Sequence, residues 1–255
     1  EELSPHIAVF TNLFPDHQDY YEGMDDYLAD KAEIFLHQGP DDTLVLGSAV
    51  AELIKEKYVG KAIVSNVVIA DPNAIGESEL GIPGMHNRAN AACALAAAEA
   101  FGVSTDAAKK ALASFTGVAG RLELIREKDG VRFYNDTTAT TPEATLAALA
   151  ALPETTGIVL IMGGSDKGLD MNALLLAVGN RAKRIILLPG TGTNRVLEFL
   201  TGASVYDTLE AAVAEAARSA ESGDAVLLSP AFASFGMFKN EYDRGDQFNA
   251  LVRAL

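Results

Sequence analysis

Three runs of consecutive apolar residues in the second half of the chain restrict its fold more than any other feature. They are GIVLIMGG (157–164), RIILLPG (184–190) and DAVLLSP (224–230). Runs of this kind are typical of strands in a parallel sheet that is covered on both faces. A helical pattern follows each of them, so we expect a doubly wound α/β sheet over residues 118–255.

The first half of the chain shows the same alternation on a smaller scale. Residues 7–10, 43–47 and 62–69 have the pattern of strands, and helical patterns lie between and after them. One of these is a long alanine-rich helix over residues 87–101. The alternation predicts a partial α/β sheet for residues 1–116.

A short segment of small residues, TGVAG (116–120), separates the two halves and is a candidate hinge. A chain of 255 residues suits two modest domains, which we place at residues 1–116 and 117–255. Directly after the hinge, two alternating strands flank Asp129-Gly130, a dipeptide that favours a hairpin turn.

The charge of the chain argues against nucleic acid as a partner. Asp and Glu number 35 against 20 Lys and Arg, which gives a net charge of −15, and such a field repels phosphate backbones. A single cysteine, Cys93, excludes an internal disulfide and disfavours a zinc cluster. No apolar run approaches the ~20 residues that span a bilayer. We therefore expect a cytoplasmic protein without a membrane partner.

Polar or glycine-rich segments follow the predicted strands. Ligands of parallel α/β sheets bind beyond the carboxyl ends of the strands, so we expect these segments to line one cleft. They are TNLFPDH (11–17), YNDTTATTPE (134–143), MGGSDKG (162–168), LPGTGTN (188–194) and LSPAFASFG (228–236).

The segment YNDTTATTPE allows two interpretations. Thr141 and Pro142 suit the cap and first turn of a helix. Asp136 lies before any cap is needed, and a carboxylate at that point could accept two hydrogen bonds from a ribose diol.

Two glycine-rich segments differ in what they predict. In MGGSDKG, Lys167 either grips a carboxylate, with the glycines allowing close backbone approach, or belongs to a tight turn with a solvated Asp-Lys pair. In LPGTGTN the third glycine of a dinucleotide fingerprint would fall at Arg195, so we discard that interpretation. A phosphate loop is absent as well, since Ala62 follows Gly60-Lys61 and Lys55 occupies the place of its first glycine.

Two further residues are candidates on weaker grounds. His17 lies between Asp16 and Asp19; a lone histidine is more often structural, although histidine and carboxylates can together hold a divalent ion. Lys31 has the pattern of an ordinary lysine on a surface helix.

Four segments, taken in order, resemble the Mur ligase family. They are TNLFPDHQDYY with DYLADKAEIF, GMHNRANAACALAAA, GRLEL with YNDTTAT, and GGSDKG with LLSPAFASFGMFKNEYDRG. The resemblance covers essentially the whole chain, and YNDTTAT and LLSPAFASF point to the branch that adds D-glutamate to UDP-N-acetylmuramoyl-L-alanine. It implies part of a central ATPase domain followed by a Rossmann-like C-terminal domain.

The resemblance also implies a chemistry for peptidoglycan synthesis. Members of the family are ATP-dependent, Mg²⁺-using ligases that join an acid to an amino acid through an acyl phosphate. The chain is similar to a piece of such an enzyme that lacks the UDP-binding domain and the phosphate loop, so we expect it to be inactive alone and to need the missing N-terminal part.

Residue roles follow from the resemblance alone. For the metal, His17 would be a ligand and Lys31 a carbamylated lysine beside it. For ATP, Asn87 and Asn90 would contact adenine, Arg121 the phosphates and Asp136 the ribose, although Asn87 is an equally good helix cap. For D-glutamate, the implied residues are Thr140, Lys167, Ser234 and the backbone around Phe235.

The chain departs from the family pattern at three positions. Thr138 stands where many relatives have lysine, Gly236 where an acidic residue is common, and Glu241 where an aromatic residue is frequent. We expect the acceptor pocket to differ in detail. The alternatives are a sister Mur or folylpolyglutamate-type ligase and a non-catalytic module that binds a nucleotide or an amino acid.

Overall fold

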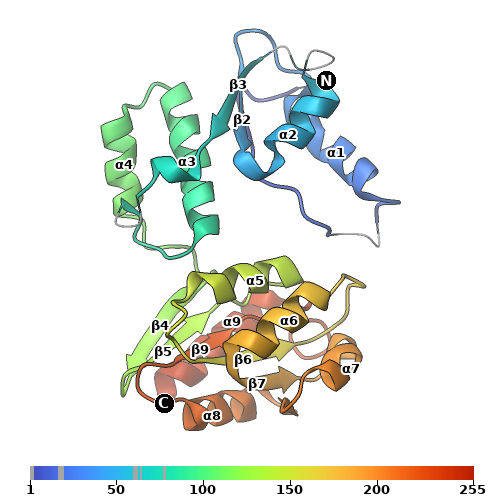
Figure 1. Cartoon of the computed structure of the whole chain (residues 1–255), viewed down its shortest axis with the longest axis vertical. Coiled ribbons are helices and arrows are strands. Elements are labelled where there is room, and N and C mark those ends of the chain that lie inside the picture. The colour runs from blue at the N-terminus through green and yellow to red at the C-terminus, as the bar shows by residue number, and fades with distance from the viewer. Residues whose placement is uncertain (1–2, 17–19, 60–62, 64, 77–78) are drawn as a thin grey trace. The chain divides into compact units, whose positions relative to one another are not determined.

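The computed structural model is an α/β protein that divides into two compact units, residues 1–116 and 117–255 (Figure 1). It describes residues 3–16, 20–59, 63, 65–76 and 79–255.

The first unit is built on a parallel sheet of three strands in the order β1-β2-β3. The strands are β1 (Ile7–Phe10), β2 (Thr43–Gly47) and β3 (Asn66–Ala70), and the helices are α1 (Met24–Leu36), α2 (Ser48–Tyr58), η1 (Pro72–Ala74), α3 (Met85–Ala100) and α4 (Thr105–Ala113). Strands β1 and β2 occupy the predicted residues, whereas β3 begins later than predicted.

Strand β2 shows why this small sheet needs helices on both faces. Its side chains alternate, so that Leu44 and Leu46 pack with Leu28 of α1 and Ile54 of α2. Val45 points the other way and packs with residues of α3, among them the alanines Ala91 and Ala92. The short alanine side chains allow α3 to lie close to the sheet.

The second unit contains a sheet of six strands in the order β4-β5-β9-β6-β7-β8, in which only the β4–β5 pair is antiparallel. The strands are β4 (Glu123–Lys128), β5 (Val131–Asn135), β6 (Ile158–Gly163), β7 (Ala182–Leu188), β8 (Ser204–Val205) and β9 (Ala225–Leu228). The helices are α5 (Pro142–Ala151), α6 (Asn172–Arg181), α7 (Thr191–Val196), η3 (Leu197–Phe199), α8 (Leu209–Ser219) and α9 (Glu241–Ala254).

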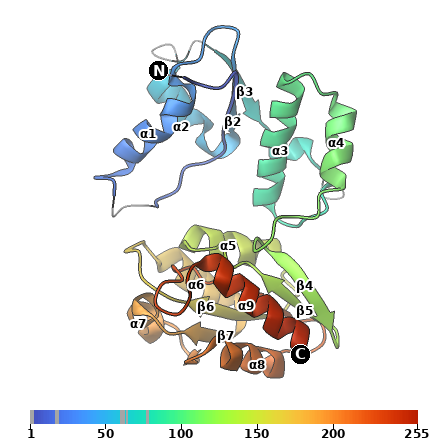
Figure 2. The ribbon, with the colours of Figure 1, turned by 180° about the vertical axis from the view of Figure 1, so that it is seen from behind.

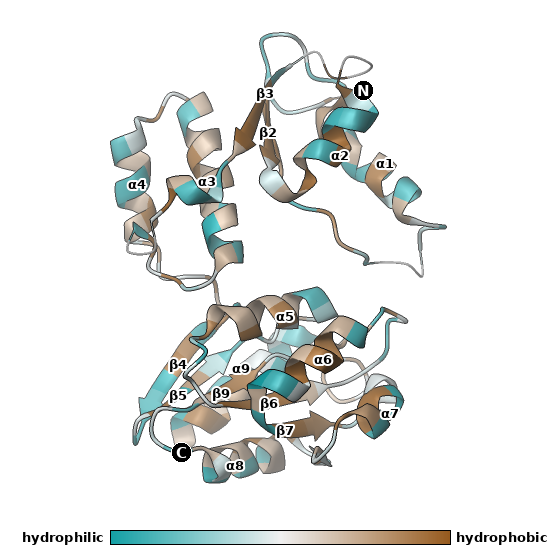
Figure 3. Ribbon diagram, viewed as in Figure 1, coloured by the Kyte–Doolittle hydropathy of each residue, from teal (hydrophilic) through white to brown (hydrophobic). Residues whose placement is uncertain are grey.

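Helices cover both faces of this sheet, which explains the three apolar runs. Leu160 and Leu227 pack against α5 and α6, which lie in front of the sheet in Figure 1. Val159 and Val226 point to the other face, toward α8 and α9, as the reverse view in Figure 2 shows. The strands are therefore apolar at successive positions, and Figure 3 colours them as hydrophobic. The doubly wound sheet predicted from the sequence is confirmed.

The predicted hairpin is also confirmed. Asp129 and Gly130 join β4 to β5 and have φ angles of +53° and +77°, the left-handed values that such a turn requires. The last helix begins later than its apolar pattern suggests, at Glu241, because the Asn240 side chain accepts a hydrogen bond from the Asp243 N–H at 2.9 Å and caps it. The short strand β8 and helix α8 were not predicted.

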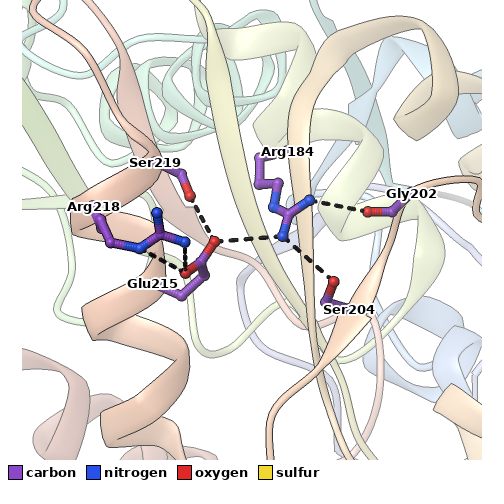
Figure 4. A network of polar contacts seen from close by, with 6 residues as sticks. All are labelled: Arg184, Gly202, Ser204, Glu215, Arg218 and Ser219. Atoms are coloured by element: carbon purple, nitrogen blue, oxygen red, sulfur yellow. Dashed lines mark hydrogen bonds and ion pairs between the residues drawn. The ribbon is translucent and has the colours of Figure 1, made fainter.

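A buried glutamate links α8 to strands β7 and β8 (Figure 4). Glu215 is 8% exposed and accepts hydrogen bonds from Arg184 of β7 at 3.4 Å, from Arg218 at 2.5 Å and from Ser219 at 2.9 Å. Hydrogen bonds from Arg218 and Ser219 hold the pKa of this carboxyl below its usual value. Arg184 also donates to Ser204 of β8 and to the Gly202 carbonyl, so that one network joins three elements.

We expect Glu215→Gln to lower the midpoint of thermal unfolding at pH 7. Glutamine keeps the shape of the side chain, but its amide nitrogen would face guanidinium donors and cannot accept from them. The measurement is thermal unfolding followed by circular dichroism. The matched control is Glu154→Gln, a substitution at an exposed glutamate in the turn after α5. Equal midpoints for the two variants would contradict the role of the network.

Among the described residues, no helix combines the length and the apolar composition needed to cross a membrane.

Candidate active site

Four loops of the second unit begin at the carboxyl ends of parallel strands, which form one edge of its sheet. Strands β5, β9, β6 and β7 are neighbours and parallel, so the segments that follow them leave from the same side. Backbone hydrogen bonds join the loops to one another. The Ala231 N–H donates to the Ala139 carbonyl at 2.9 Å, and the Ser165 N–H donates to the Ala233 carbonyl at 2.9 Å. The polar segments predicted to gather beyond these four strands do so.

The glycines at this edge allow the loops to touch backbone to backbone. Gly164 has a φ of +140°, and a Cβ atom placed on it would lie 2.3 Å from the Ala233 carbonyl oxygen. A Cβ atom on Gly190 would lie 2.2 Å from the Gly164 carbonyl oxygen. Side chains are excluded at both positions because these distances are shorter than van der Waals contact allows. The glycine signal in MGGSDKG thus reflects contact between loops.

Asp136 is buried at the end of β5, with 8% of its surface exposed. One carboxylate oxygen accepts from the Leu122 N–H at 3.0 Å and the other from the Ser229 hydroxyl at 2.7 Å. Burial raises the pKa of Asp136 to about 7, although the bonds from Ser229 and Leu122 and the charge of Arg121 oppose the rise. Asp136 is therefore poised to change its charge near neutral pH.

Lys167 follows β6 and reaches the loop that follows β5. Its Nζ donates to the Thr140 hydroxyl at 3.3 Å. From the same turn, the Ser165 hydroxyl donates to the Phe235 carbonyl at 2.7 Å. Ser234 is buried and the Phe235 side chain is exposed. The structure thus brings a lysine, three residues with hydroxyl groups and an aromatic ring from three loops to one edge of the sheet.

Comparison with known proteins identifies the family. The model of the Mur ligase middle domain matches residues 1–66, and that of the Mur ligase glutamate ligase domain matches residues 120–232. The UDP-N-acetylmuramoylalanine–D-glutamate ligases of Roseiflexus sp. and Pelotomaculum thermopropionicum are each 37% identical, over 99% and 98% of the chain. The chain belongs to the Mur ligase family. It spans about three fifths of the length of these relatives, 61% and 60%.

Solved structures of Mur ligases share the fold. MurF from Acinetobacter baumannii superposes with a TM-score of 0.77 at 20% identity, over 99% of this chain and 60% of that one. MurF from Thermotoga maritima in complex with ADP gives a TM-score of 0.71 at 18% identity, over 99% of this chain and 64% of that one. Both matches extend across the two units.

Four of the predicted Mur ligase site residues belong to the first unit. Lys31 is exposed on α1, with its Nζ 5.3 Å from the centre of the Tyr27 ring. Asn87 and Asn90 lie one turn apart on α3, where the Asn87 side chain donates to the Pro83 carbonyl at 2.6 Å. The interpretation of Asn87 as a helix cap is wrong, because α3 begins at Met85 and Gly84 occupies the cap position. His17 lies outside the described residues.

Among the described residues, no three His, Cys, Asp or Glu side chains are grouped so that they could together hold a metal ion. An unmodified lysine such as Lys31 offers a cation and no acceptor, so it cannot ligate a metal. The role of Lys31 and His17 at a metal stays a prediction.

Each of the three departures from the family pattern has a structural role in the second unit. Gly236 has a φ of +93°, which a residue with a side chain adopts only under strain. Glu241 is the first residue of α9, where a negative charge suits the helix dipole. Thr138 donates its hydroxyl to the Gly120 carbonyl at 2.9 Å and so ties the β5 loop to the start of the unit.

Sequence reasoning missed two residues that organise the site. Ser229 received no functional role from the sequence, yet its hydroxyl donates to the Asp136 carboxylate. Arg244 of α9 was not singled out, although it is fully buried beneath the loops. The dipeptide Arg244-Gly245 on the buried face of an amphipathic helix is the signal that could have found it.

Proposed function

We propose that the chain supplies the acceptor-binding part, and a portion of the ATP-binding part, of a ligase that adds D-glutamate to UDP-N-acetylmuramoyl-L-alanine. The observation that carries the proposal is that Lys167 donates to Thr140 of the β5 loop, while Ser165 of the same turn donates to the β9 loop that contains Ser234. A cation beside hydroxyl groups suits a ligand with carboxylates. The name shared by the relatives at 37% identity supports D-glutamate as that ligand.

The reaction would proceed by activation of an acid. ATP transfers its terminal phosphoryl group to the carboxylate of the muramoyl-alanine substrate and leaves as ADP. The amine of D-glutamate attacks the acyl phosphate carbon, the C–N bond forms, the C–O bond to phosphate breaks, and the amine releases a proton. When bound, Mg²⁺ would offset the charge on the phosphoryl group.

The residues of this chain would bind and orient the reactants. Lys167 would pair with a carboxylate of D-glutamate, with Thr140, Ser234 and the Phe235 backbone completing the pocket. Such positioning makes the attack effectively intramolecular. Arg121 would contact the ATP phosphates.

Asp136 and the first unit would hold the rest of the nucleotide. Asp136 would accept from the ribose in addition to its present donors, since each carboxylate oxygen has two lone pairs. Asn87 and Asn90 would face adenine from one side of α3. We assign residues 1–116 to the central ATPase domain, residues 117–255 to the C-terminal domain, and the reaction to the cytoplasm.

The test compares the complete ligase that contains this chain with the chain alone. We expect phosphate release by the complete ligase only when ATP, the muramoyl-alanine substrate and D-glutamate are all present. The 255-residue chain alone should make no product, because it has no phosphate loop. Turnover with another amino acid and not with D-glutamate would indicate a sister ligase, and nucleotide binding without any turnover would indicate a binding module.

A further inference from the structure

Arg244 of α9 is the largest fully buried side chain among the described residues. Burial lowers the pKa of its guanidinium to about 10, so it remains charged at neutral pH. It donates from Nε to the Thr137 hydroxyl at 3.1 Å and from Nη2 to the Thr137 carbonyl at 2.8 Å. Its Nη1 donates to the Phe232 carbonyl at 3.4 Å. One side chain therefore holds the loop after β5 and the loop after β9.

Other residues of α9 hold the same stretch of the β5 loop. The Thr137 hydroxyl donates to the Glu241 carbonyl at 2.7 Å. The Asn135 side chain donates to the Gly245 carbonyl at 3.3 Å and to the Asn249 side chain at 2.9 Å. A Cβ atom on Gly245 would lie 2.6 Å from the Thr137 methyl group, so glycine lets the helix approach the loop.

The residues held by Arg244 are immediate neighbours of the proposed acceptor pocket. Thr137 lies between Asp136 and Thr140 in the β5 loop, and Phe232 precedes Ser234 and Phe235 in the β9 loop. A guanidinium is a rigid planar fork with donors on several sides, which can fix two carbonyl groups relative to each other. A lysine in the same place is a point charge on a flexible stem and cannot fix them in this way.

We propose that Arg244 is a positioning residue. It would fix the distance between the loops after β5 and β9 so that both can bind the amino acid, an inference that rests on the proposed function. It touches no substrate and acts through Thr137 and Phe232. Loss of the fork would let Thr140 and Ser234 drift apart and would weaken binding of the amino acid. ATP would be less affected, because Asp136 is held by Leu122 and Ser229 and not by Arg244.

A purely structural role is the competing explanation, and Arg181 provides the matched control. Like that of Arg244, its guanidinium donates to several backbone carbonyl groups. In the described part of the chain these are the carbonyls of Leu149, Leu152, Pro153 and Glu154 at the end of α5. These carbonyl groups lie in the last turn of α5 and directly after it, at the opposite edge of the sheet from the four loops.

The first test is steady-state kinetics of Arg244→Lys and Arg181→Lys in the complete ligase. We expect Arg244→Lys to raise the KM for D-glutamate about tenfold or more and to leave the KM for ATP within about twofold, since a small misplacement of binding groups is costly. Arg181→Lys should change neither KM. Equal effects of the two variants, or an unchanged D-glutamate KM in Arg244→Lys, would overturn the proposal. If Arg244→Lys does not fold, Thr137→Val, which removes the hydroxyl that Arg244 contacts, takes its place.

The second test does not depend on activity. Hydrogen exchange in the 255-residue chain should be faster in Arg244→Lys at the amides of Ala139 and Ala231, which lie in the two loops, than in the wild type. Amides of β6 should be unaffected. Unchanged exchange in the loops would overturn the positioning role whatever the kinetics. If the wild-type ligase shows no D-glutamate-dependent turnover, the proposed function fails, and the exchange result alone decides whether Arg244 fixes the loops.

Discussion

Substitution of Lys167 by alanine in the complete ligase is expected to raise the KM for D-glutamate about 10- to 150-fold, because a hydrogen bond to a charged group contributes about 1.5–3 kcal/mol. The KM for ATP should stay within about twofold of the wild-type value, since Lys167 lies with Thr140 and the β9 loop at the proposed acceptor pocket. The measurement is initial rate against D-glutamate concentration at saturating ATP.

Lys183 offers the matched control for Lys167. It lies at the start of β7, at the opposite edge of the sheet, and pairs with Glu221 at 2.7 Å and with Asp224 at 2.9 Å. Lys183→Ala also removes one cation, so it reproduces any general effect of net charge. A similar rise in KM for both variants would remove Lys167 from the acceptor pocket.

Substitution of Asp136 by asparagine is expected to change how stability depends on pH. The folded-state pKa of Asp136 is raised from 3.8 to about 7, so between these values the folded protein binds a proton that the unfolded chain has lost. The stability due to this group is therefore present at low pH and is lost as pH rises through the folded pKa. From about pH 5.5 to about pH 8.5 the wild type should lose about 2 kcal/mol relative to Asp136→Asn.

Denaturant unfolding of the two proteins at several pH values measures this difference. The variant Ser229→Ala tests the assignment to Asp136, because the Ser229 hydroxyl lowers the pKa of that carboxyl. Its removal should move the loss of stability to higher pH. Parallel pH profiles for the wild type and Asp136→Asn would show that Asp136 does not titrate in this range.

Much of the fold could be predicted from the sequence because short, local runs of apolar residues form the core strands. The runs around Leu160, Ile186 and Leu227 are apolar at every position, and only strands covered on both faces require this. Asp129-Gly130 specified the hairpin through the backbone angles that the turn needs. Helix α8 carries a clear amphipathic pattern but was passed over, and the two-residue strand β8 carries almost no local signal.

The location of the site residues could be predicted from the sequence, but most of their hydrogen-bond partners could not. Parallel topology places every loop that follows a strand at one edge, so the segments with Thr140, Lys167 and Ser234 could be expected there. The partners of Asp136 could not be, since Ser229 is 93 residues away and its contact depends on the neighbouring positions of β5 and β9. The local pattern of α9 places Arg244 on the buried face of that helix, but the loops that Arg244 contacts depend on how the helix packs on the sheet.

The contact between glycine backbones at the edge of the sheet has a consequence for how the proposed amino-acid specificity could be altered. Gly164 and Gly190 leave no room for larger residues at the start of these loops. Variation is therefore confined to the outward side chains, such as those at positions 140, 167 and 235. Substitutions at those three positions should be able to change the proposed specificity, whereas substitutions of the two glycines should disrupt the loops.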